Sequence, residues 1–237
     1  MGLSALVTGA TSGIGKAAAE ELGRHGAEII VHGRDAARGS AVAGTITAAG
    51  GTARFVAADL TDPAQVDHLA GQAGAVDVLV NNAGFSWFGP AADLDVATFD
   101  RLVAANARAA YFLVAALAPK MAARGSGSII SLGSMAGQIG LAGGAAYGAT
   151  KAALAAMTRS WAAEFSPAGV RVNAIAAGPV LTAGAAPGRI EALGATTLLA
   201  RAAQPGEIAS VIALLASPKA SYITGAVIAA DGGRTAT

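Results

Sequence analysis

Residues 3–15, LSALVTGATSGIG, join an apolar run to a glycine-rich turn. The run 3–8 holds no charged residue, as expected of a strand that is covered on both faces. Gly9, Gly13 and Gly15 then lead into a helical stretch. Glycine at such a turn lets backbone N–H groups approach a phosphate at the positive end of the helix. One glycine pattern is a weak signal in a chain that holds 32 glycines. The stretch predicts a strand, a phosphate-binding turn and a helix, and that prediction depends on the rest of the chain.

Similar apolar runs recur along the chain and alternate with alanine-rich stretches. We expect strands at 3–8, 27–32, 52–58, 76–81, 128–132, 170–175 and 226–230, and helices at 14–24, 36–49, 63–70, 97–122, 147–165 and 207–216. This alternation predicts an α/β fold, a parallel sheet with helices on both faces. The length of 237 residues suits a single domain, 1–237. The irregular stretch from 182 to about 200 is expected to be a substrate loop with one short helix, since such loops usually hold the ligand.

Composition excludes several classes of function. Net charge is +1 with no basic run, so we expect no nucleic-acid partner and no anionic membrane surface. The chain has no cysteine, which rules out disulfides, thiolate catalysis and cysteine-bound metal. His25, His32 and His68 lack metal-ligand spacing, so no metal is predicted. The N-terminus has no signal-peptide pattern, and the apolar run 109–118 is shorter than the ~20 residues of a membrane span. We therefore expect a cytoplasmic protein.

A tyrosine and a lysine lie four residues apart in AAYGATKAAL, residues 145–154. On a helix this spacing places Tyr147 and Lys151 on one face. A phenol has a pKa of about 10, and a fixed ammonium nearby favours the phenolate. The tyrosine could then give a proton to a carbonyl oxygen, or take one from an alcohol, near neutral pH. Spacing alone leaves the alternative of an aromatic anchor beside an exposed lysine.

The end of the second expected strand bears on the choice of dinucleotide. An acid at this position normally binds the ribose 2′-hydroxyl, whereas a nearby arginine accommodates a 2′-phosphate. Gly33 stands at the acid position and Arg34 follows it. This pattern predicts NADP(H). Asp35 could serve only as a helix N-cap, but a shift in register would let it meet the 2′-hydroxyl and favour NAD(H), which stays possible.

Motifs farther along the chain join the turn and the Tyr-Lys pair in a common pattern. In chain order they are Thr8-Gly9-x-x-x-Gly13-Ile14-Gly15, Asp59-Leu60, Asn81-Asn82-Ala83-Gly84, Asn106, Ser134 at 13 residues before Tyr147, Asn173, Ala177-Gly178-Pro179-Val180-x-Thr182, Thr224-Gly225 and Asp231-Gly232-Gly233. Over nearly its whole length the sequence resembles the short-chain dehydrogenase/reductase family. The resemblance implies a single Rossmann-type, doubly wound domain with a seven-stranded parallel sheet in the order 3-2-1-4-5-6-7.

The resemblance also implies roles for individual residues. Tyr147 would be the general acid/base, Lys151 would lower its pKa and bind the nicotinamide ribose, and Ser134 would bind the substrate oxygen. Asn106 would hold a water that links Lys151 to solvent. The cofactor-binding set implied is Gly9, Thr11, Ser12, Gly13, Ile14, Gly15, Arg34, Asp59, Leu60, Asn82, Ala83, Gly84, Tyr147, Lys151, Pro179, Val180 and Thr182. The chain departs from the family at Ala177, where proline is usual, and at Ser12, where NADP-preferring members often have a basic residue.

Candidate substrate-pocket residues follow the expected fourth and fifth strands. They are Phe85, Trp87, Phe88, Met135, Gln138 and Leu141, and the aromatic ones could equally be core or subunit packing. Helices 97–122 and 147–165 are apolar on more than one face, and the resemblance implies a homotetramer built through them.

The function expected is NADP(H)-dependent interconversion of a ketone and a secondary alcohol. Reduction of a 3-oxoacyl thioester, of fatty-acid or polyketide type, is the alternative. Ala168-Gly169 lacks the basic residue that some carrier-protein-using relatives place there, so a free ketone or alcohol is favoured. A non-catalytic dinucleotide-binding sensor is a third possibility.

Overall fold

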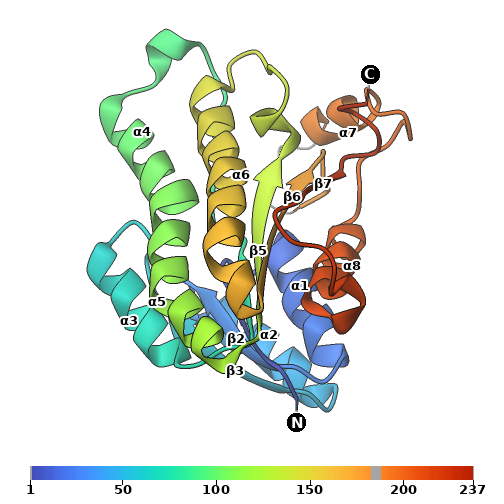
Figure 1. Ribbon diagram of the computed structural model, residues 1–237. Coiled ribbons are helices and arrows are strands. Elements are labelled where there is room, and N and C mark those ends of the chain that lie inside the picture. Colours follow the sequence, from blue (N-terminus) through green and yellow to red (C-terminus); the bar gives the residue numbers. More distant parts are fainter. Residues whose placement is uncertain (1, 183–187, 237) are drawn as a thin grey trace.

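The computed structural model describes residues 2–182 and 188–236. Its strands form one parallel sheet in the order β3-β2-β1-β4-β5-β6-β7 (Figure 1). The strands are β1 Ser4–Val7, β2 Glu28–Gly33, β3 Thr52–Ala57, β4 Val78–Asn81, β5 Gly127–Ser134, β6 Val170–Ala177 and β7 Val227–Ala230. This order, with helices on both faces, confirms the predicted Rossmann-type architecture.

Two helical layers cover the sheet (Figure 1). One contains α1 Gly13–Arg24, α2 Ala36–Ala48 and α8 Pro205–Ala216; the other contains α3 Pro63–Ala73, α4 Val96–Val103, α5 Ala109–Arg124 and α6 Ala145–Phe165. Helix α7, Arg189–Gly194, is the short helix expected in the substrate loop. Residues 183–187 of that loop lie outside the part of the chain that the structure describes. Short 3₁₀ turns are η1 Ala91–Asp93, η3 Met135–Gly137, η4 Ser166–Ala168 and η5 Pro218–Ala220.

Strands β1 to β6 each contribute to two hydrophobic cores because successive side chains point to opposite faces. Val7 and Ile130 belong to the core under α1 and α8, whereas their neighbours Leu6 and Ile129 belong to the core under α5 and α6. This arrangement explains why the strands are almost continuously apolar in sequence.

Strands β5 and β6 run two residues beyond their expected ends, and these residues reach the site. Gly133 pairs with Ala176 and Ser134 with Ala177. The sequence did not predict this extension, because strands are located by their bulky apolar side chains and these residues are small or polar.

The expected helix 97–122 is present as a continuous helical run with a π-turn, η2 Ala104–Arg108, between α4 and α5. Such turns occur often at functional sites, and this one contains Asn106. Within the described residues, Val96–Arg124 is the run that is long and apolar enough to cross a membrane by length and composition. Over half of it, 56%, is buried inside the protein, as in a core helix.

Candidate active site

The predicted site residues gather at the carboxyl edge of the sheet, the upper end in Figure 1. In a parallel sheet all strands end at the same edge, so loops that are far apart in sequence meet there. The turn after β1, Asp59 after β3, Ser134 at the end of β5 and Thr182 after β6 all lie on this edge.

Thr8 and Asn82 fix the glycine-rich turn in place. Thr8 Oγ1 donates to the Val80 carbonyl over 3.1 Å and accepts from the amides of Asn82 and Ala83 at 2.9 and 3.0 Å. Asn82 Nδ2 donates to the carbonyls of Thr8 and Gly9 at 2.8 and 3.2 Å. The side-chain amide of Asn82 therefore supports the turn. The direct contact between Asn82 and the cofactor stays a prediction.

The N-terminus of α1 is open. Its N-cap residue, Ser12, makes no side-chain hydrogen bond to the helix, and the first turn has no acidic residue. By contrast, α2, α3 and α4 are each capped by the carboxylate of Asp35, Asp62 or Asp95. The first amides of a helix need an acceptor, so this end of α1 fits a phosphate of a dinucleotide.

The segment after β6 reaches the same turn. A methyl group added to Gly13, which has φ of 54°, would lie 3.1 Å from Cγ2 of Thr182. The segment is held from behind, because the amide of Leu181 donates to the Ala203 carbonyl at 2.9 Å and the amide of Ala203 donates to the Pro179 carbonyl at 2.9 Å. The structure thus brings the first and last parts of the predicted cofactor set together.

At the end of β2, the environment of Gly33 disfavours an acid. A side chain at Gly33 would collide with Cγ2 of Thr11. Asp35 is engaged elsewhere: Oδ1 accepts from the Arg38 amide at 3.0 Å and Oδ2 pairs with Arg38 Nε at 2.8 Å. These bonds from Arg38 hold the pKa of the Asp35 carboxyl below its usual range. Arg34 is exposed, and among the described residues no carboxylate forms a salt bridge with it.

Asp59 lies beside this positive charge. Its Oδ1 accepts from the amide and hydroxyl of Thr61, both at 2.9 Å. The hydrogen bond from the Thr61 backbone amide lowers the pKa of the Asp59 carboxyl, and the positive charges of Arg34 and Arg101 lower it further. Asp59 is therefore ionised at neutral pH and available to accept a hydrogen bond from an adenine amino group.

The predicted catalytic residues form one cluster. Tyr147 and Lys151 lie on α6, with Lys151 Nζ 5.8 Å from the centre of the tyrosine ring. Ser134 ends β5, its Oγ accepts from the Ala136 amide at 3.2 Å, and its hydroxyl acts on the phenol closely enough to lower the pKa of Tyr147. The Thr150 hydroxyl, which donates to the Tyr147 carbonyl at 2.8 Å, accepts from Asn106 Nδ2 at 3.1 Å. The four residues thus meet at the point where β5, α6 and the π-turn converge.

The sequence predicts a lowered pKa for Tyr147, but in the protein without bound cofactor the pKa of this phenol is raised. Burial raises the pKa of the phenol, and the Ser134 hydroxyl only partly opposes that shift. Burial also lowers the pKa of Lys151, which is 6% exposed, to about 8, and its Nζ donates to the Leu132 carbonyl at 2.7 Å. Desolvation of the phenol is therefore the larger effect. At neutral pH the phenol is protonated, which is the state that donates a proton.

Asn106 is 1% exposed, and its side chain is engaged by protein groups. Nδ2 donates to the Phe85 carbonyl at 2.8 Å as well as to Thr150, and Oδ1 accepts from the Phe85 amide at 3.0 Å. A methyl group at Gly84 would lie 2.6 Å from Oδ1. Asn106 therefore joins the loop after β4 to α6, and its water-holding role stays a prediction.

Phe88 and Arg189 line the approach to Tyr147. The Phe88 and Tyr147 rings are 5.6 Å apart between centroids, and the Arg189 guanidinium carbon lies 4.1 Å from the Phe88 centroid. Phe88 packs closely on Gly144, since a methyl group added there would lie only 2.7 Å from Phe88 Cε1. Arg189 was not singled out from the sequence, although it lies in the irregular stretch that was expected to be a substrate loop.

The other predicted pocket residues differ in placement. Phe85 lies under Arg101, whose guanidinium carbon is 5.8 Å from the ring centroid, and Trp87 and Leu141 are half-buried. Gln138 is exposed, whereas Met135 is 4% exposed and packs inside the fold. The two loops that carry these residues are joined, since the Gly89 amide donates to the Gly143 carbonyl at 3.1 Å.

Two of the motif residues support the fold beside the site. Asn173 Nδ2 donates to the Ile223 carbonyl at 2.8 Å and Oδ1 accepts from the Ala226 amide at 3.1 Å, which ties β6 to the entry of β7. Asp231 accepts from the Gly233 and Thr235 amides, both at 2.9 Å. These bonds set the course of the C-terminal segment.

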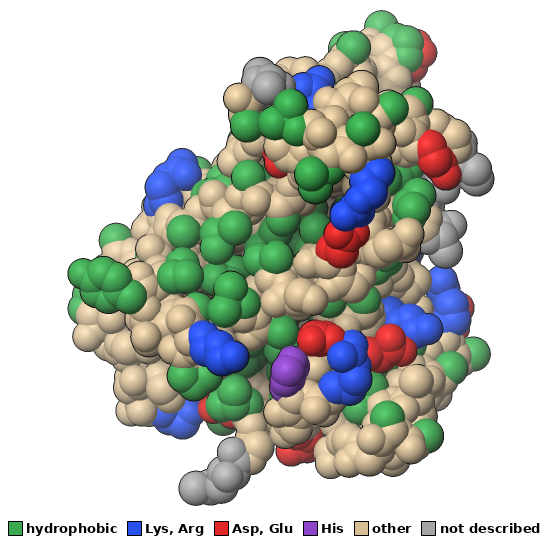
Figure 2. Space-filling view, turned by 90° about the vertical axis from the view of Figure 1, so that its right-hand side faces the viewer, with side chains coloured by type: hydrophobic (Ala, Val, Ile, Leu, Met, Phe, Trp, Pro, Cys, Tyr) green, Lys and Arg blue, Asp and Glu red, His purple; other side chains and the backbone are tan. Residues whose placement is uncertain are grey.

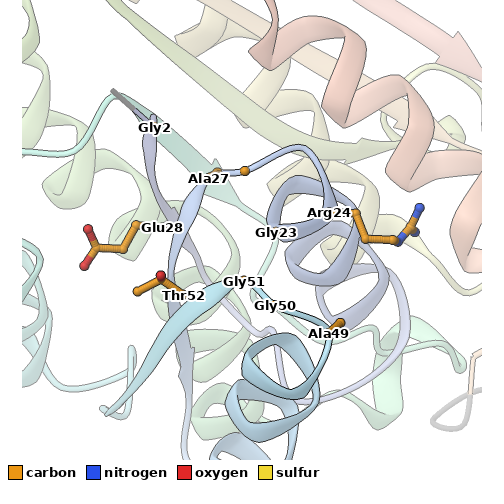
Figure 3. A pocket seen from close by; sticks show the side chains of 10 residues that line it. Gly2, Gly23, Arg24, Ala27, Glu28, Ala49, Gly50, Gly51 and Thr52 are labelled. Carbon is orange, nitrogen blue, oxygen red and sulfur yellow. The ribbon is translucent and has the colours of Figure 1, made fainter.

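A surface hollow of about 480 Å³ lies at the amino edge of the sheet, away from the site. Half of its lining residues are glycines, and Figure 3 shows the charged side chains of Arg24 and Glu28 pointing in opposite directions. With no converging polar groups, this hollow lacks the character of a ligand site.

The sheet order and the open turn are those of a Rossmann-type dinucleotide-binding fold. A family profile described as enoyl-(acyl carrier protein) reductase matches residues 9–235. Cis-4-hydroxycyclohexanecarboxylate dehydrogenase of Sinomonas cyclohexanicum is 39% identical over 241 residues, which cover 98% of this chain and 96% of that protein. The chain belongs to the short-chain dehydrogenase/reductase family of oxidoreductases.

Two solved structures agree over the full chain. A protein described as an NAD(P)-dependent gluconate 5-dehydrogenase from Beutenbergia cavernae, solved with NADP bound at low occupancy, has a TM-score of 0.95 and 38% identity, and the match covers 100% of this chain and 98% of that one. A protein assigned as a beta-ketoacyl-ACP reductase has a TM-score of 0.92 and 47% identity, and the match covers 100% and 99%.

Proposed function

We propose that the protein is an NADP(H)-dependent oxidoreductase that interconverts a ketone and a secondary alcohol. The observation that carries the proposal is the cluster around Tyr147, a half-buried residue whose ring lies 5.8 Å from Lys151 Nζ and whose pKa is affected by the Ser134 hydroxyl. A non-catalytic dinucleotide sensor would have no need of this cluster.

In the reductive direction, Ser134 and Tyr147 bind the carbonyl oxygen by their hydroxyl groups. As negative charge develops on that oxygen, Tyr147 gives it the phenolic proton and Ser134 stabilises the charge. The bound dinucleotide supplies the hydride to the carbonyl carbon. Lys151, which is charged below its pKa of about 8, stabilises the phenolate left behind. The turn at Gly13–Gly15 would hold the phosphates, and Asp59 the adenine.

The preference for NADP(H) rests on Arg34, with support from the NADP found in a related structure. We expect Arg34→Ala to raise KM for NADPH about tenfold or more, because a charged hydrogen bond to phosphate is lost. KM for NADH should hardly change, since that cofactor has no 2′-phosphate.

Steady-state kinetics with both cofactors checks this expectation. Arg24→Ala, at the opposite edge of the sheet, is the matched control. An equal rise of both Michaelis constants in the Arg34 variant would contradict the assignment.

For the substrate we propose a free ketone or alcohol that bears a carboxylate or similar anion. Two relatives are named for hydroxy acids, a hydroxycyclohexanecarboxylate and gluconate. In this chain Arg189 brings a cation to the wall beside Tyr147, and no described carboxylate forms a salt bridge with it. A guanidinium in that place matches a carboxylate on the substrate.

The 3-oxoacyl thioester alternative is supported by the relative assigned as a beta-ketoacyl-ACP reductase. Arg124 and Arg171 lie near the turn before β6, and their contacts disfavour a role in binding a carrier protein beside the active site. Arg124 Nη2 donates to the Val76 carbonyl at 2.6 Å, and Arg171 Nη2 donates to the Ser217 carbonyl at 3.3 Å. Both lie where β4 and β6 begin, at the opposite edge from Tyr147.

A substrate panel followed by NADPH absorbance tests the proposed function. The panel contains cyclohexanone, 4-oxocyclohexanecarboxylate, its methyl ester and acetoacetyl-CoA. We expect kcat/KM to be at least tenfold higher for the acid than for its ester, and Arg189→Gln to remove that difference. Equal rates for acid and ester in the wild-type protein would contradict the anionic substrate, and a preference for the thioester would favour the alternative.

We also propose that the protein is a cytoplasmic homotetramer formed by one domain per chain. Tyr111 and Phe112 on α5 are each 48% exposed. Figure 2 shows hydrophobic side chains gathered on the face that contains α8, where Leu214 is 43% exposed. Two separate apolar faces suit two kinds of two-fold contact. Light scattering should give a mass well above the 22.9 kDa of one chain.

A further inference from the structure

His32 is a buried histidine that the proposed chemistry does not use. It lies in β2, directly before Gly33, and is only 2% exposed. A polar ring in a strand covered on both faces costs free energy unless its nitrogens are hydrogen-bonded. Both nitrogens are in fact bonded, and each bond leads to a different loop of the cofactor site.

One bond reaches the glycine-rich turn and the other reaches the end of β3. The Gly9 amide donates to His32 Nδ1 at 3.2 Å, and His32 Nε2 lies 3.1 Å from the Ala58 carbonyl oxygen. A carbonyl can only accept, so Nε2 carries the proton and Nδ1 is the acceptor. The backbone of His32 adds a third link, because its carbonyl accepts from the Ala10 amide at 2.8 Å.

The ring is neutral at physiological pH, as this pattern requires. Burial lowers its pKa to about 4, although the bond to Ala58 and the charge of Asp59 oppose the shift. A protonated ring would turn Nδ1 into a donor that faces the Gly9 amide, and the link to the turn would be lost.

We propose that His32 is a positioning residue for the dinucleotide, which fixes the phosphate-binding turn through the Gly9 amide and sets its spacing from the adenine-side loop. The inference rests on the proposed function, because it presupposes that the turn binds a dinucleotide. Gly9 has φ of 64°, and its amide donates to the imidazole, which adds to the bonds of Thr8 and Asn82 that hold the turn. The amides of the α1 N-terminus are thereby left to face the phosphate.

Two substitutions separate the two bonds. The side-chain oxygen of asparagine reaches the place of Nδ1, so His32→Asn keeps an acceptor for Gly9 and loses the bond to Ala58. The amide nitrogen of glutamine reaches the place of Nε2, so His32→Gln keeps the bond to Ala58 and loses the acceptor. Each variant loses one buried hydrogen bond, so we expect similar losses in Tm.

Cofactor affinity should differ between the two variants. By calorimetric titration with NADPH, we expect Kd of His32→Asn to stay within about threefold of wild type and Kd of His32→Gln to rise about tenfold, the effect of one lost hydrogen bond. At saturating NADPH, kcat should be retained in both. Equal Kd values in the two variants, whether changed or unchanged, would overturn the proposal. A wild-type protein that fails to bind NADPH would instead overturn the proposed function.

A measurement on the wild-type protein covers the case in which a variant does not fold. Nitrogen NMR of ¹⁵N-histidine-labelled protein should show a neutral ring protonated at Nε2, with an Nδ1 shift that moves when NADPH is added. A ring protonated at Nδ1 cannot accept from Gly9 and would refute the proposal, as would an Nδ1 shift that does not respond to the cofactor.

Discussion

Replacement of Tyr147 by phenylalanine should lower turnover about a thousandfold while NADPH binding stays nearly unchanged. The substitution removes only the hydroxyl that donates the proton, and general acid catalysis contributes on the order of a hundredfold to ten-thousandfold. The Phe88 ring, 5.6 Å away, would still pack against the phenyl group, so the pocket should keep its shape.

Stopped-flow measurement of NADPH oxidation, together with calorimetric Kd values, checks this result. Tyr222→Phe is the matched control, because Tyr222 is fully exposed and lies outside the site. Turnover within a few-fold of wild type in the Tyr147 variant would remove Tyr147 from its role as proton donor.

Gly15→Ala should weaken NADPH binding by at least a hundredfold. The new methyl group would collide with the Gly9 carbonyl oxygen and with Asn82 Nδ2, both of which belong to the fixed turn. Because backbone cannot move aside cheaply, the turn must open and the phosphate cradle is lost. Two or more hydrogen bonds to phosphate are at stake, each worth about 1.5–3 kcal/mol.

Gly44→Ala provides the control for this substitution. Gly44 is an exposed residue of α2, and a methyl group there meets nothing within 4 Å. Alanine in a helix interior should raise the stability by up to about 1 kcal/mol with no change in Kd for NADPH. If Gly15→Ala behaves like Gly44→Ala in calorimetric titration, the turn does not hold the cofactor.

The fold could be predicted because its signals are local and repeated. Most strands are nearly continuous apolar runs, and the structure confirms that Asp35, which was considered as a helix N-cap, caps α2. The shared face of Tyr147 and Lys151 also followed from helical spacing alone. These features depend on residues that are close in the chain.

The features that could not be predicted depend on residues that are far apart in the chain. The pKa of Tyr147 is controlled by burial, which depends on how segments that are far apart in the chain pack around the phenol. The bond between His32 and Gly9 joins residues that are 23 positions apart. Phe88 was predicted as a pocket residue, but its contact with Arg189 joins residues about a hundred positions apart and could not be predicted from either segment alone.

The contact between Thr11 and Gly33 has a consequence for how this enzyme could change over evolutionary time. An acid at position 33, the usual means of recognising a ribose hydroxyl, has no room while the Thr11 methyl group occupies that space. The effect of an acid at position 33 therefore depends on the residue at position 11, so the two positions are epistatic. A lineage with this pair would gain the acid only after the Thr11 side chain turns away or is replaced, whereas a loss of preference for NADPH could begin separately at Arg34.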